Sequence, residues 1–434
     1  MAVTLQRRSW PDSVPDQGEL SSRAAAEAYV GGVCFKLGPP ALIGAELEWL
    51  TTGPTGARPS LDRMAAALGP YAPVSLAPAS AAAALPGGSR VTVEPGGQIE
   101  LSSAPFADPA ALTRHLAADA ARLRDLLAAH RIGILAAAAD AARPAERLLR
   151  LPRYAAMERR FAGIGPFGAL MMCNTAATQV SVDAGADPGE VGARWTALYA
   201  LGPALIAAFA CSPRLHGAPP GSWASQRMRA WLRLDPSRVR PPVADWTDPI
   251  SAYARWALDV PLLCLRCTDR DADWSPPPGA TFADWLSGAL DDEVSRRPGR
   301  ADLDYHLTTL FPPVRAAGHL EVRYLDTQPG AGWTTPIHLF DALLSTPAVL
   351  AQATALAAPV AGEWSTAARY GLADPEIRRA AVDVLELATA HARTDSAAAE
   401  LALASRRCRA GLTPLETAHN GSGVVAPTVS ENAP

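Results

Sequence analysis

Acidic residues lie inside three short apolar stretches of this chain, where a buried strand would ordinarily carry none. The stretches are residues 43–49, 97–101 and 319–326. Polar residues alternate in them with Leu, Ile, Val or aromatic residues, and successive side chains of a strand point to opposite faces of its sheet. Polar residues two positions apart therefore share a face: Glu46 with Glu48, Gln98 with Glu100, and Glu321 with Arg323. Several such strands in one sheet would line a surface with carboxylates, which bind divalent metal and hence nucleotide phosphate.

Four of these carboxylates are suited to hold magnesium, which prefers oxygen ligands and often keeps water and substrate phosphates in its shell. They are Glu46, Glu48, Glu100 and Glu321. Side by side they would repel one another unless cations neutralise them. The same cations would stabilise charge during phosphoryl transfer. Arginines that suit bidentate contacts with carboxylate or phosphate occur in polar and aromatic segments, namely Arg227, Arg238, Arg315 and Arg323.

Each candidate also has a purely structural interpretation. A Glu-x-Glu pair on a strand more often marks a solvated face than a metal site, but apolar residues flank Glu46 and Glu48 on both sides, which favours a central strand. Three further residues have structural alternatives: Arg323 as an ion-pair partner of Glu321, His306 as a satisfied core histidine, and Asp326 as the polar end of its strand.

The bulk composition limits the class of protein. The chain has 434 residues, of which 49% are hydrophobic and 19% charged, so it can build a substantial core. A net charge of -4 argues against a nucleic-acid or anionic-membrane surface. Residues 1–18 lack the apolar run of a signal peptide, and the apolar stretch 195–211 is interrupted by Gly202-Pro203. We therefore expect a cytoplasmic protein without nucleic-acid or membrane partners. Separately from these composition values, we expect a monomer or weak homodimer.

Six cysteines are scattered through the chain and are expected to be reduced and mostly buried. Cys264 and Cys267 form a C-x-x-C pair, but no second ligand pair at zinc spacing accompanies it. The pair belongs to the apolar run 260–265, which predicts a strand. A structural role is therefore favoured over metal or redox chemistry.

Hydrophobic periodicity predicts a mixed order of helices and strands. Strands are expected at 42–51, 91–94, 98–102, 132–138, 175–183, 260–265 and 319–326, the second and third joined in a hairpin. Helices are expected at 21–35, 59–68, 108–130, 153–161, 188–211, 225–234, 248–258, 282–290 and, Ala-rich, from about 336 to 411. This order fits an α+β fold, an antiparallel-rich sheet with helices on its outer face. We expect a flexible lead (1–20), one catalytic domain (21–412) and a disordered tail (413–434).

Five motifs carry a family resemblance when they are taken together in chain order. They are Gly44-x-Glu46-x-Glu48; Gln98-Ile99-Glu100-Leu101-Ser102; Met171-Met172 followed by Thr175 and Thr178-Gln179-Val180; Ser225-x-Arg227 with Trp231, Asp235 and Arg238; and His306-Leu307-Thr308-Thr309 with Arg315, Glu321 and Arg323. The chain resembles the glutamate–cysteine ligases of the branch shared by plants and many bacteria. Asp259-Val260-Pro261 and Tyr324-Leu325-Asp326 resemble the actinobacterial form, which begins ergothioneine biosynthesis.

The resemblance implies a glutamine-synthetase-like fold with an active-site funnel on a curved, mostly antiparallel sheet. It implies ATP, two or three Mg²⁺ ions, L-glutamate and L-cysteine as ligands. In the implied reaction the γ-carboxylate of glutamate attacks the γ-phosphate of ATP, giving γ-glutamyl phosphate and ADP. The amine of cysteine then attacks the acyl phosphate, giving γ-glutamylcysteine and phosphate.

The resemblance also implies roles for individual residues. Glu46, Glu48, Glu100 and Glu321 would be magnesium ligands, with Glu94 a secondary candidate because the hairpin spacing varies in the family. Gln179 would meet metal or substrate. Arg227 and Arg315 would grip glutamate carboxylates or phosphate, and Arg323 would face the transferring phosphoryl group. Arg238 and His306 would support nucleotide or substrate, and Arg323 with Arg227 would be the catalytic pair.

Three alternatives stay open at this point. A related carboxylate–amine ligase would use the same sheet chemistry to join glutamate to a different amine. A guanidino phosphotransferase would phosphorylate an arginine-like substrate and form no amide bond. A non-catalytic scaffold would have no need for clustered buried carboxylates.

Overall fold

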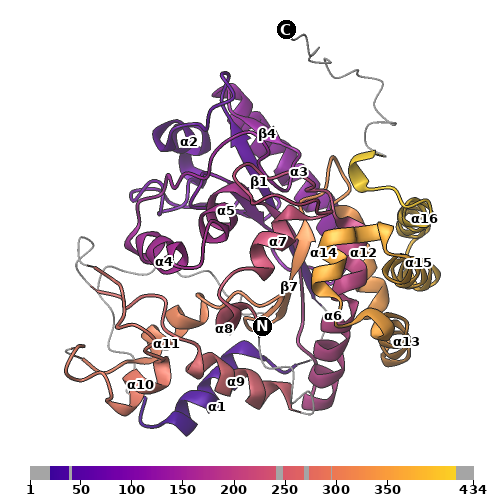
Figure 1. Cartoon of the computed structure of the whole chain (residues 1–434). Helices are drawn as coiled ribbons and strands as arrows, with labels where there is room; N and C mark the ends of the chain where they lie inside the picture. The colour runs from indigo at the N-terminus through magenta and orange to yellow at the C-terminus, as the bar shows by residue number, and fades with distance from the viewer. Residues whose placement is uncertain (1–19, 39–41, 241–247, 268–272, 295, 417–434) are drawn as a thin grey trace.

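The computed structural model describes residues 20–38, 42–240, 248–267, 273–294 and 296–416 (Figure 1). The expected lead lies almost wholly outside these ranges, and so does most of the expected tail. Within the described residues no single helix is long and apolar enough to cross a membrane. One bent pair, Thr334–Leu343 with Pro347–Val360, passes that test by length and composition only.

A seven-stranded sheet forms the centre of the fold, in the order β2-β3-β1-β5-β7-β6, with β4 paired to β1. The strands are β1 (Ile43–Thr52), β2 (Arg90–Val93), β3 (Ile99–Ser102), β4 (Gly133–Leu135), β5 (Ala177–Val182), β6 (Val314–Ala316) and β7 (Leu320–Asp326). Every pairing between them is antiparallel. The expected mixture of helices with an antiparallel sheet is confirmed.

The helices are α1 (Arg23–Cys34), α2 (Leu61–Leu68), α3 (Pro109–Ala129), α4 (Pro152–Ala162), α5 (Phe167–Asn174), α6 (Pro188–Phe209), α7 (Gln226–Leu232), α8 (Pro236–Val239), α9 (Pro249–Asp259), α10 (Phe282–Ser287), α11 (Arg300–Leu307), α12 (Thr334–Leu343), α13 (Pro347–Ala357), α14 (Trp364–Tyr370), α15 (Pro375–Ala390) and α16 (Asp395–Arg409). Many begin at a Ser, Thr or Asp whose side chain accepts a hydrogen bond from a main-chain N–H of the first turn, as Asp108 does for α3.

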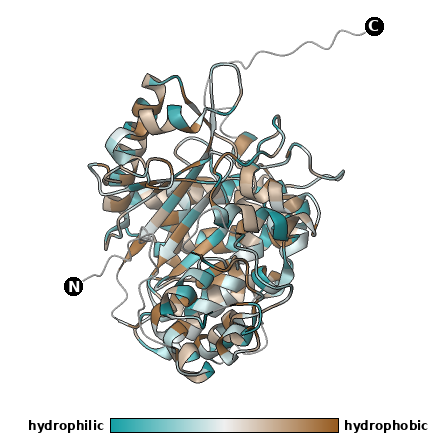
Figure 2. Ribbon diagram, turned by 90° about the vertical axis from the view of Figure 1, so that its left-hand side faces the viewer, coloured by the Kyte–Doolittle hydropathy of each residue, from teal (hydrophilic) through white to brown (hydrophobic). Residues whose placement is uncertain are grey.

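One face of the sheet is apolar and packs on helices. Leu47 of β1 lies opposite Leu101 and Thr178, and Ala45 lies opposite Val180. Helices α3, α6 and α12 contact β1, β5 or β7, and the Tyr324 hydroxyl on β7 donates to the carbonyl of Leu198 in α6. The strands in the middle of Figure 2 are accordingly banded in hydrophilic and hydrophobic colours. The opposite face is left for polar side chains.

The C-terminal helices extend this core away from the sheet. Helices α13, α14 and α15 pack on α6, and α16 packs on α15 and α12 (Figure 1). Helix α6 runs through Gly202-Pro203 without ending. A side chain at Gly202 would overlap the ring of Trp364, so this glycine allows α14 to approach α6 closely.

The predicted secondary structure was wrong for the run 260–265, and it omitted α5, α8, α11 and β6. The run 260–265 is not a strand; it makes only an isolated bridge between Pro261 and Thr281. Strand β6 was not predicted, because it is three residues long and follows directly on Pro312-Pro313. The six cysteines all fall in the described ranges, none forms a disulfide, and every one except Cys267 is buried, as expected.

Candidate active site

The strand register brings polar side chains from four strands onto one face of the sheet. Residues directly opposite each other on antiparallel strands point to the same face. Glu48 lies opposite Glu100, Glu46 opposite Gln179, and Ser181 opposite Glu321. We call the side chains of Glu46, Glu48, Glu100, Gln179 and Glu321 the polar face. The structure thus brings the four predicted carboxylates together on one sheet surface.

Glu48 is the most strongly perturbed member of the polar face. Its carboxylate accepts hydrogen bonds from the main-chain N–H of Ala177, at 2.8 Å, and from Nε2 of Gln179, at 2.6 Å. Burial, followed by the nearby charges of Glu100 and Glu94, raises the pKa of Glu48 to about 8. A raised pKa means that ionising Glu48 costs free energy in the folded protein, and a cation beside it would lower that cost.

Glu46 and Glu100 share a single hydroxyl donor. Ser102 Oγ lies 3.1 Å from Glu46 Oε1 and 3.2 Å from Glu100 Oε1, yet a hydroxyl has one proton to donate. Glu100 is buried and also accepts from Oγ1 of Thr92, at 2.6 Å. Two carboxylates around one donor form an oxygen-rich cluster of the kind that divalent cations occupy.

Glu94 and Gln98 flank the turn between β2 and β3 and have different surroundings. The charge of Glu94 helps to raise the pKa of Glu48, so Glu94 lies near the polar face; magnesium ligation by Glu94 stays a prediction. Gln98 instead donates from Nε2 to the carbonyls of Met172 and Thr175, and its Oε1 accepts from the N–H of Gly96. Its amide therefore ties the hairpin to α5.

Glu321 lies between two arginines. Arg315 on β6 donates to both of its carboxylate oxygens, at 2.9 and 3.0 Å, and Arg323 donates to Oε1. All three side chains are buried or nearly so. Magnesium ligation by Glu321 stays a prediction, and a metal ion at that site would compete with these guanidinium groups.

Gln179 offers an acceptor to this surface. Its side chain is 1% exposed, and Oε1 has no hydrogen-bond partner among the described residues. Its Nε2 is already used by Glu48. A buried amide oxygen without a donor is costly unless a ligand satisfies it, which fits the predicted contact of Gln179 with metal or substrate.

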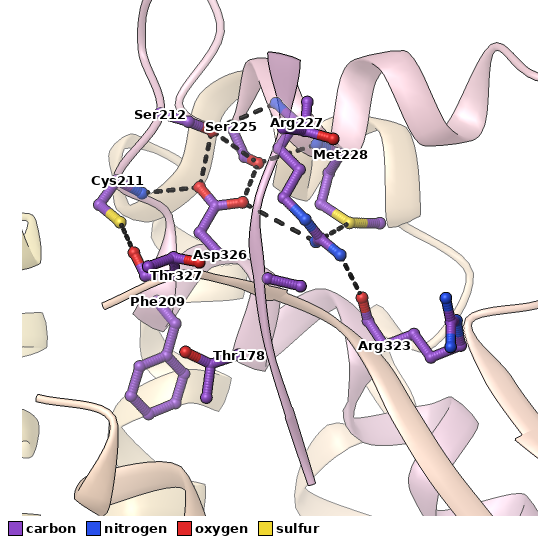
Figure 3. Close-up of polar contacts among 12 residues, drawn as sticks. Thr178, Phe209, Cys211, Ser212, Ser225, Arg227, Met228, Arg323, Asp326 and Thr327 are labelled. Atoms are coloured by element: carbon purple, nitrogen blue, oxygen red, sulfur yellow. Dashed lines mark hydrogen bonds and ion pairs between the residues drawn. The ribbon is translucent and has the colours of Figure 1, made fainter. Parts of the chain in front are cut away.

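Arg227 reaches the same region from α7. Its side chain is 2% exposed, and its Nη2 donates to the carbonyl of Arg323, at 2.6 Å (Figure 3). The ring of Trp231 has its centroid 5.4 Å from the guanidinium carbons of both Arg227 and Arg323. Trp231 therefore makes cation–π contacts with both of the predicted catalytic arginines, a role that its place in the motif alone did not indicate.

Asp326, at the end of β7, is the other residue whose place sequence reasoning missed. The β5–β7 register shifts between Thr178 and Val180, so that Ser181 pairs with Glu321 but Ala177 pairs with Asp326. Ser181 and Ala177 share a face, so this β-bulge places Glu321 and Asp326 on the same face although five positions separate them. Asp326 is buried among Cys211, Ser212, Ser225 and Arg227 (Figure 3).

Arg238 and His306 lie together elsewhere, and their contacts are structural. Arg238 is fully buried and donates to the carbonyls of Thr309 and Pro261. Nε2 of His306 is 2.7 Å from the carbonyl oxygen of Ala257, and burial lowers the pKa of His306 to about 4. These bonds hold α8, α9 and α11 together. Support of nucleotide or substrate by this pair stays a prediction.

The buried His306 should make the free energy of unfolding sensitive to acid. Its pKa lies below the value near 6.5 of an exposed histidine, so the unfolded chain binds more protons between pH 6.5 and 4. Stability is therefore present above pH 6.5 and is lost as the pH falls towards 4, by about 2 kcal/mol at pH 5. His306→Gln keeps a donor for Ala257 and should flatten this part of the pH dependence in thermal unfolding. The exposed His115→Gln on α3 is the control; an unchanged slope in H306Q would refute the assignment.

The donor set fits magnesium, although no metal cluster is preformed among the described residues. Within the described part of the chain, no group of three or more His, Cys, Asp or Glu side chains is already gathered around a metal position. The polar face nevertheless supplies hard oxygen ligands: Glu46, Glu48 and Glu100, with the unsatisfied amide oxygen of Gln179 beside them. To hold a cation, these carboxylate side chains would have to turn towards one common position.

Known proteins with similar sequences are glutamate–cysteine ligases. The model of glutamate–cysteine ligase family 2 (GCS2) matches residues 42–424. The glutamate–cysteine ligase EgtA of Mycolicibacterium smegmatis is 40% identical over 382 residues, covering 86% of this chain and 86% of that protein. EgtA of Mycobacterium tuberculosis H37Rv is 37% identical over 399 residues, covering 91% of this chain and 89% of that protein.

A solved structure shares the fold. The glutamate–cysteine ligase of Francisella tularensis, determined in complex with AMP, superposes with a TM-score of 0.51 at 13% sequence identity. The likeness covers 89% of this chain and 86% of that one. With a family model that spans most of the chain and relatives at 37 to 40% identity over nearly their full length, the chain belongs to glutamate–cysteine ligase family 2 and is a ligase.

Proposed function

We propose that this ligase joins the γ-carboxylate of L-glutamate to the amine of L-cysteine at the expense of ATP, giving γ-glutamylcysteine, ADP and phosphate. The observation that carries the proposal is the polar face, with Glu48 opposite Glu100 and Glu46 opposite Gln179, bordered by Arg315, Arg323 and Arg227. The names of the EgtA relatives support the two amino-acid substrates.

A carboxylate is a poor acyl donor until one of its oxygens becomes part of a leaving group. In the proposed first step a γ-carboxylate oxygen of glutamate attacks the γ-phosphorus of ATP, and the bond to the ADP oxygen breaks. In the second step the cysteine nitrogen attacks the γ-carbonyl carbon, the carbon–oxygen bond to phosphate breaks, and the nitrogen loses a proton. Both steps bring anions together, so the site must supply positive charge.

Glu46, Glu48 and Glu100, with Gln179 beside them, would hold magnesium in this proposal, and Glu94 and Glu321 are the further candidates. Bound magnesium would neutralise phosphate charge and so let one anion approach another. The AMP complex of the Francisella tularensis ligase supports a nucleotide site in this fold. The high cost of the Glu48 carboxylate in a buried row of acids is consistent with a cation beside it.

The arginines supply the fixed positive charge. Arg227 and Arg323 both contact the ring of Trp231, and Arg323 is anchored through Glu321. We infer that Arg323 faces the transferring phosphoryl group and that Arg227 and Arg315 orient a substrate carboxylate or phosphate. Guanidinium groups suit this role because they stay charged and present paired donors.

Substrate omission tests the proposal. Magnesium-dependent ADP release is expected to need both glutamate and cysteine and to fall to background when either is left out. A panel of other amines, with products identified by mass spectrometry, distinguishes cysteine from a different acceptor. ADP release that is unchanged without cysteine would overturn the cysteine assignment, and release that ignores glutamate would overturn the ligase reaction itself.

We also infer a metabolic role for this ligase. The EgtA relatives support a role at the start of ergothioneine biosynthesis, which the sequence resemblance implied. A cytoplasmic location and a monomer or weak homodimer stay predictions. The deletion of the gene in its host, followed by measurement of ergothioneine, tests the metabolic role.

A further inference from the structure

Asp326 is a buried carboxylate with a full set of donors. Its Oδ2 accepts from the main-chain N–H of Cys211, at 2.9 Å, and from Oγ of Ser212, at 2.7 Å. Its Oδ1 accepts from Oγ of Ser225, at 2.8 Å. The side chain is 2% exposed. Every one of these contacts uses Asp326 as an acceptor, so the two serine hydroxyl protons are committed to it.

The two serines pass this orientation on to α7. With their protons directed at Asp326, the hydroxyl oxygens are left as acceptors for the helix. Ser225 is the N-cap of α7 and accepts from the N–H of Met228, at 3.0 Å, and Ser212 accepts from the N–H of Arg227, at 3.2 Å. Figure 3 shows this pair of hydroxyls between Asp326 and the start of the helix. Asp326 therefore fixes the main chain of Arg227 indirectly, through the hydroxyls of Ser212 and Ser225.

The side chain of Arg227 bonds back to β7, the strand that carries Asp326. Its Nη2 donates to the carbonyl of Arg323, three residues before Asp326 on the same strand. The direct approach of Arg227 Nη1 to Asp326 Oδ1 is 4.0 Å, which is too long for a hydrogen bond. Asp326 thus supports Arg227 chiefly through the serines and as a buried counter-charge.

The β-bulge in β7 makes the arrangement possible. Regular alternation would turn Asp326 away from Glu321 and Arg323, towards the apolar face. The register shift returns it to the side of the polar face, where it meets α7. Bulges are typical of positions where a strand must redirect a side chain near an active site.

We propose that Asp326, acting through the hydroxyls of Ser212 and Ser225, is a positioning residue that holds Arg227 against Arg323 at the reacting end of the site. The proposal rests on the function proposed above and adds a residue that touches no substrate. Because Asp326 would align the arginines, replacing its carboxylate should lower kcat more than it weakens the binding of cysteine.

A double-mutant cycle separates positioning from general stabilisation. The variants are Asp326→Asn, Arg227→Lys and the two combined, each checked for folding by circular dichroism. The amide in D326N places a donor where an acceptor is needed by Ser225 or Ser212, with little change of volume. Because small misplacements of a catalytic group cost on the order of 10²-fold, kcat should fall by about that factor in D326N, with KM for cysteine changed less than about threefold.

The combined variant gives the decisive readout. If Asp326 acts through Arg227, D326N should lower kcat by less than about threefold once Arg227 is already Lys. A combined loss equal to the product of the two single losses would overturn the proposal, as would wild-type kcat in D326N. Ser60→Ala is the matched control: it removes the N-cap of α2, a helix on another part of the fold, and should leave kcat and KM unchanged.

Two arrangements keep the test decisive. If D326N does not fold, Ser212→Ala and Ser225→Ala replace it in the same cycle, each expected to lower kcat by about tenfold and to lose that effect in the Arg227→Lys background. The wild-type protein is assayed beside them with glutamate, cysteine and ATP. Absence of wild-type turnover would refute the proposed function; wild-type turnover with independent losses in the cycle would refute only the positioning role.

Discussion

Glu48→Gln is expected to lower kcat by about two to three orders of magnitude while the fold stays intact. The substitution removes a predicted magnesium ligand from the centre of the polar face, where Glu48 lies opposite Glu100. Once the Gln179 amide turns over, its Oε1 can accept from the new amide nitrogen, and the oxygen retained at position 48 can still accept from the N–H of Ala177. The structure therefore accommodates the amide, and the loss falls on catalysis.

The same variant should be at least as stable as the wild type when magnesium is absent. The pKa of Glu48 is raised to about 8, so the folded state binds more protons than the unfolded state between pH 4.5 and 8. Ionised Glu48 thus lowers wild-type stability as the pH rises through this window, and E48Q lacks that cost. Thermal unfolding in EDTA at pH 8 measures it. The exposed Glu158→Gln on α4 is the control, and wild-type turnover in E48Q would remove Glu48 from the site.

Arg323→Lys is the second substitution with a large expected effect, a fall in kcat of about 10²-fold. Lysine keeps the charge but loses the planar group that lies over Trp231 and bonds Glu321. Glu321 retains both hydrogen bonds from Arg315, so the sheet should hold. Steady-state kinetics with glutamate, cysteine and ATP measures the change.

A matched surface variant controls for the loss of a guanidinium group. Arg393→Lys alters an exposed arginine that bonds Asp341 at 2.8 Å, and it should leave kcat unchanged. If R323K retained kcat within about threefold of the wild type, Arg323 would be a structural partner of Glu321 and no more.

The sequence predicted the polar face well because alternation in a strand is a local signal. Glu46 and Glu48, two positions apart on β1, needed only the strand assignment to be placed on one side. That they meet Glu100 and Gln179 depends on the register, which the hairpin and the family motifs indicated but local periodicity did not. The carboxylates came together as expected.

Asp326 shows where alternation fails. Counting by twos from Glu321 puts it on the opposite face, and a β-bulge of one residue reverses that result. Its partners Ser212 and Ser225 lie about a hundred residues earlier in the chain, so no spacing rule links them to β7. Long-range side-chain networks of this kind are set by tertiary packing, which a single sequence does not display.

The strand predicted at 260–265 was wrong for a related reason: tertiary packing decided its structure. Most of its apolar residues are buried, as in a strand, but the sheet offers them no neighbour, and Pro261 cannot donate a hydrogen bond. Arg238 takes the carbonyl of Pro261 instead. An apolar run therefore predicted burial correctly and secondary structure incorrectly.

If the polar face makes an acyl phosphate of glutamate, one γ-carboxylate oxygen must pass to phosphate. Glutamate labelled with ¹⁸O in both γ-carboxylate oxygens is turned over with ATP, magnesium and cysteine, and the phosphate and the dipeptide are analysed by mass spectrometry. One labelled oxygen should appear in the released phosphate and one should remain in γ-glutamylcysteine. Phosphate that carries no label during product formation would exclude a γ-glutamyl phosphate intermediate.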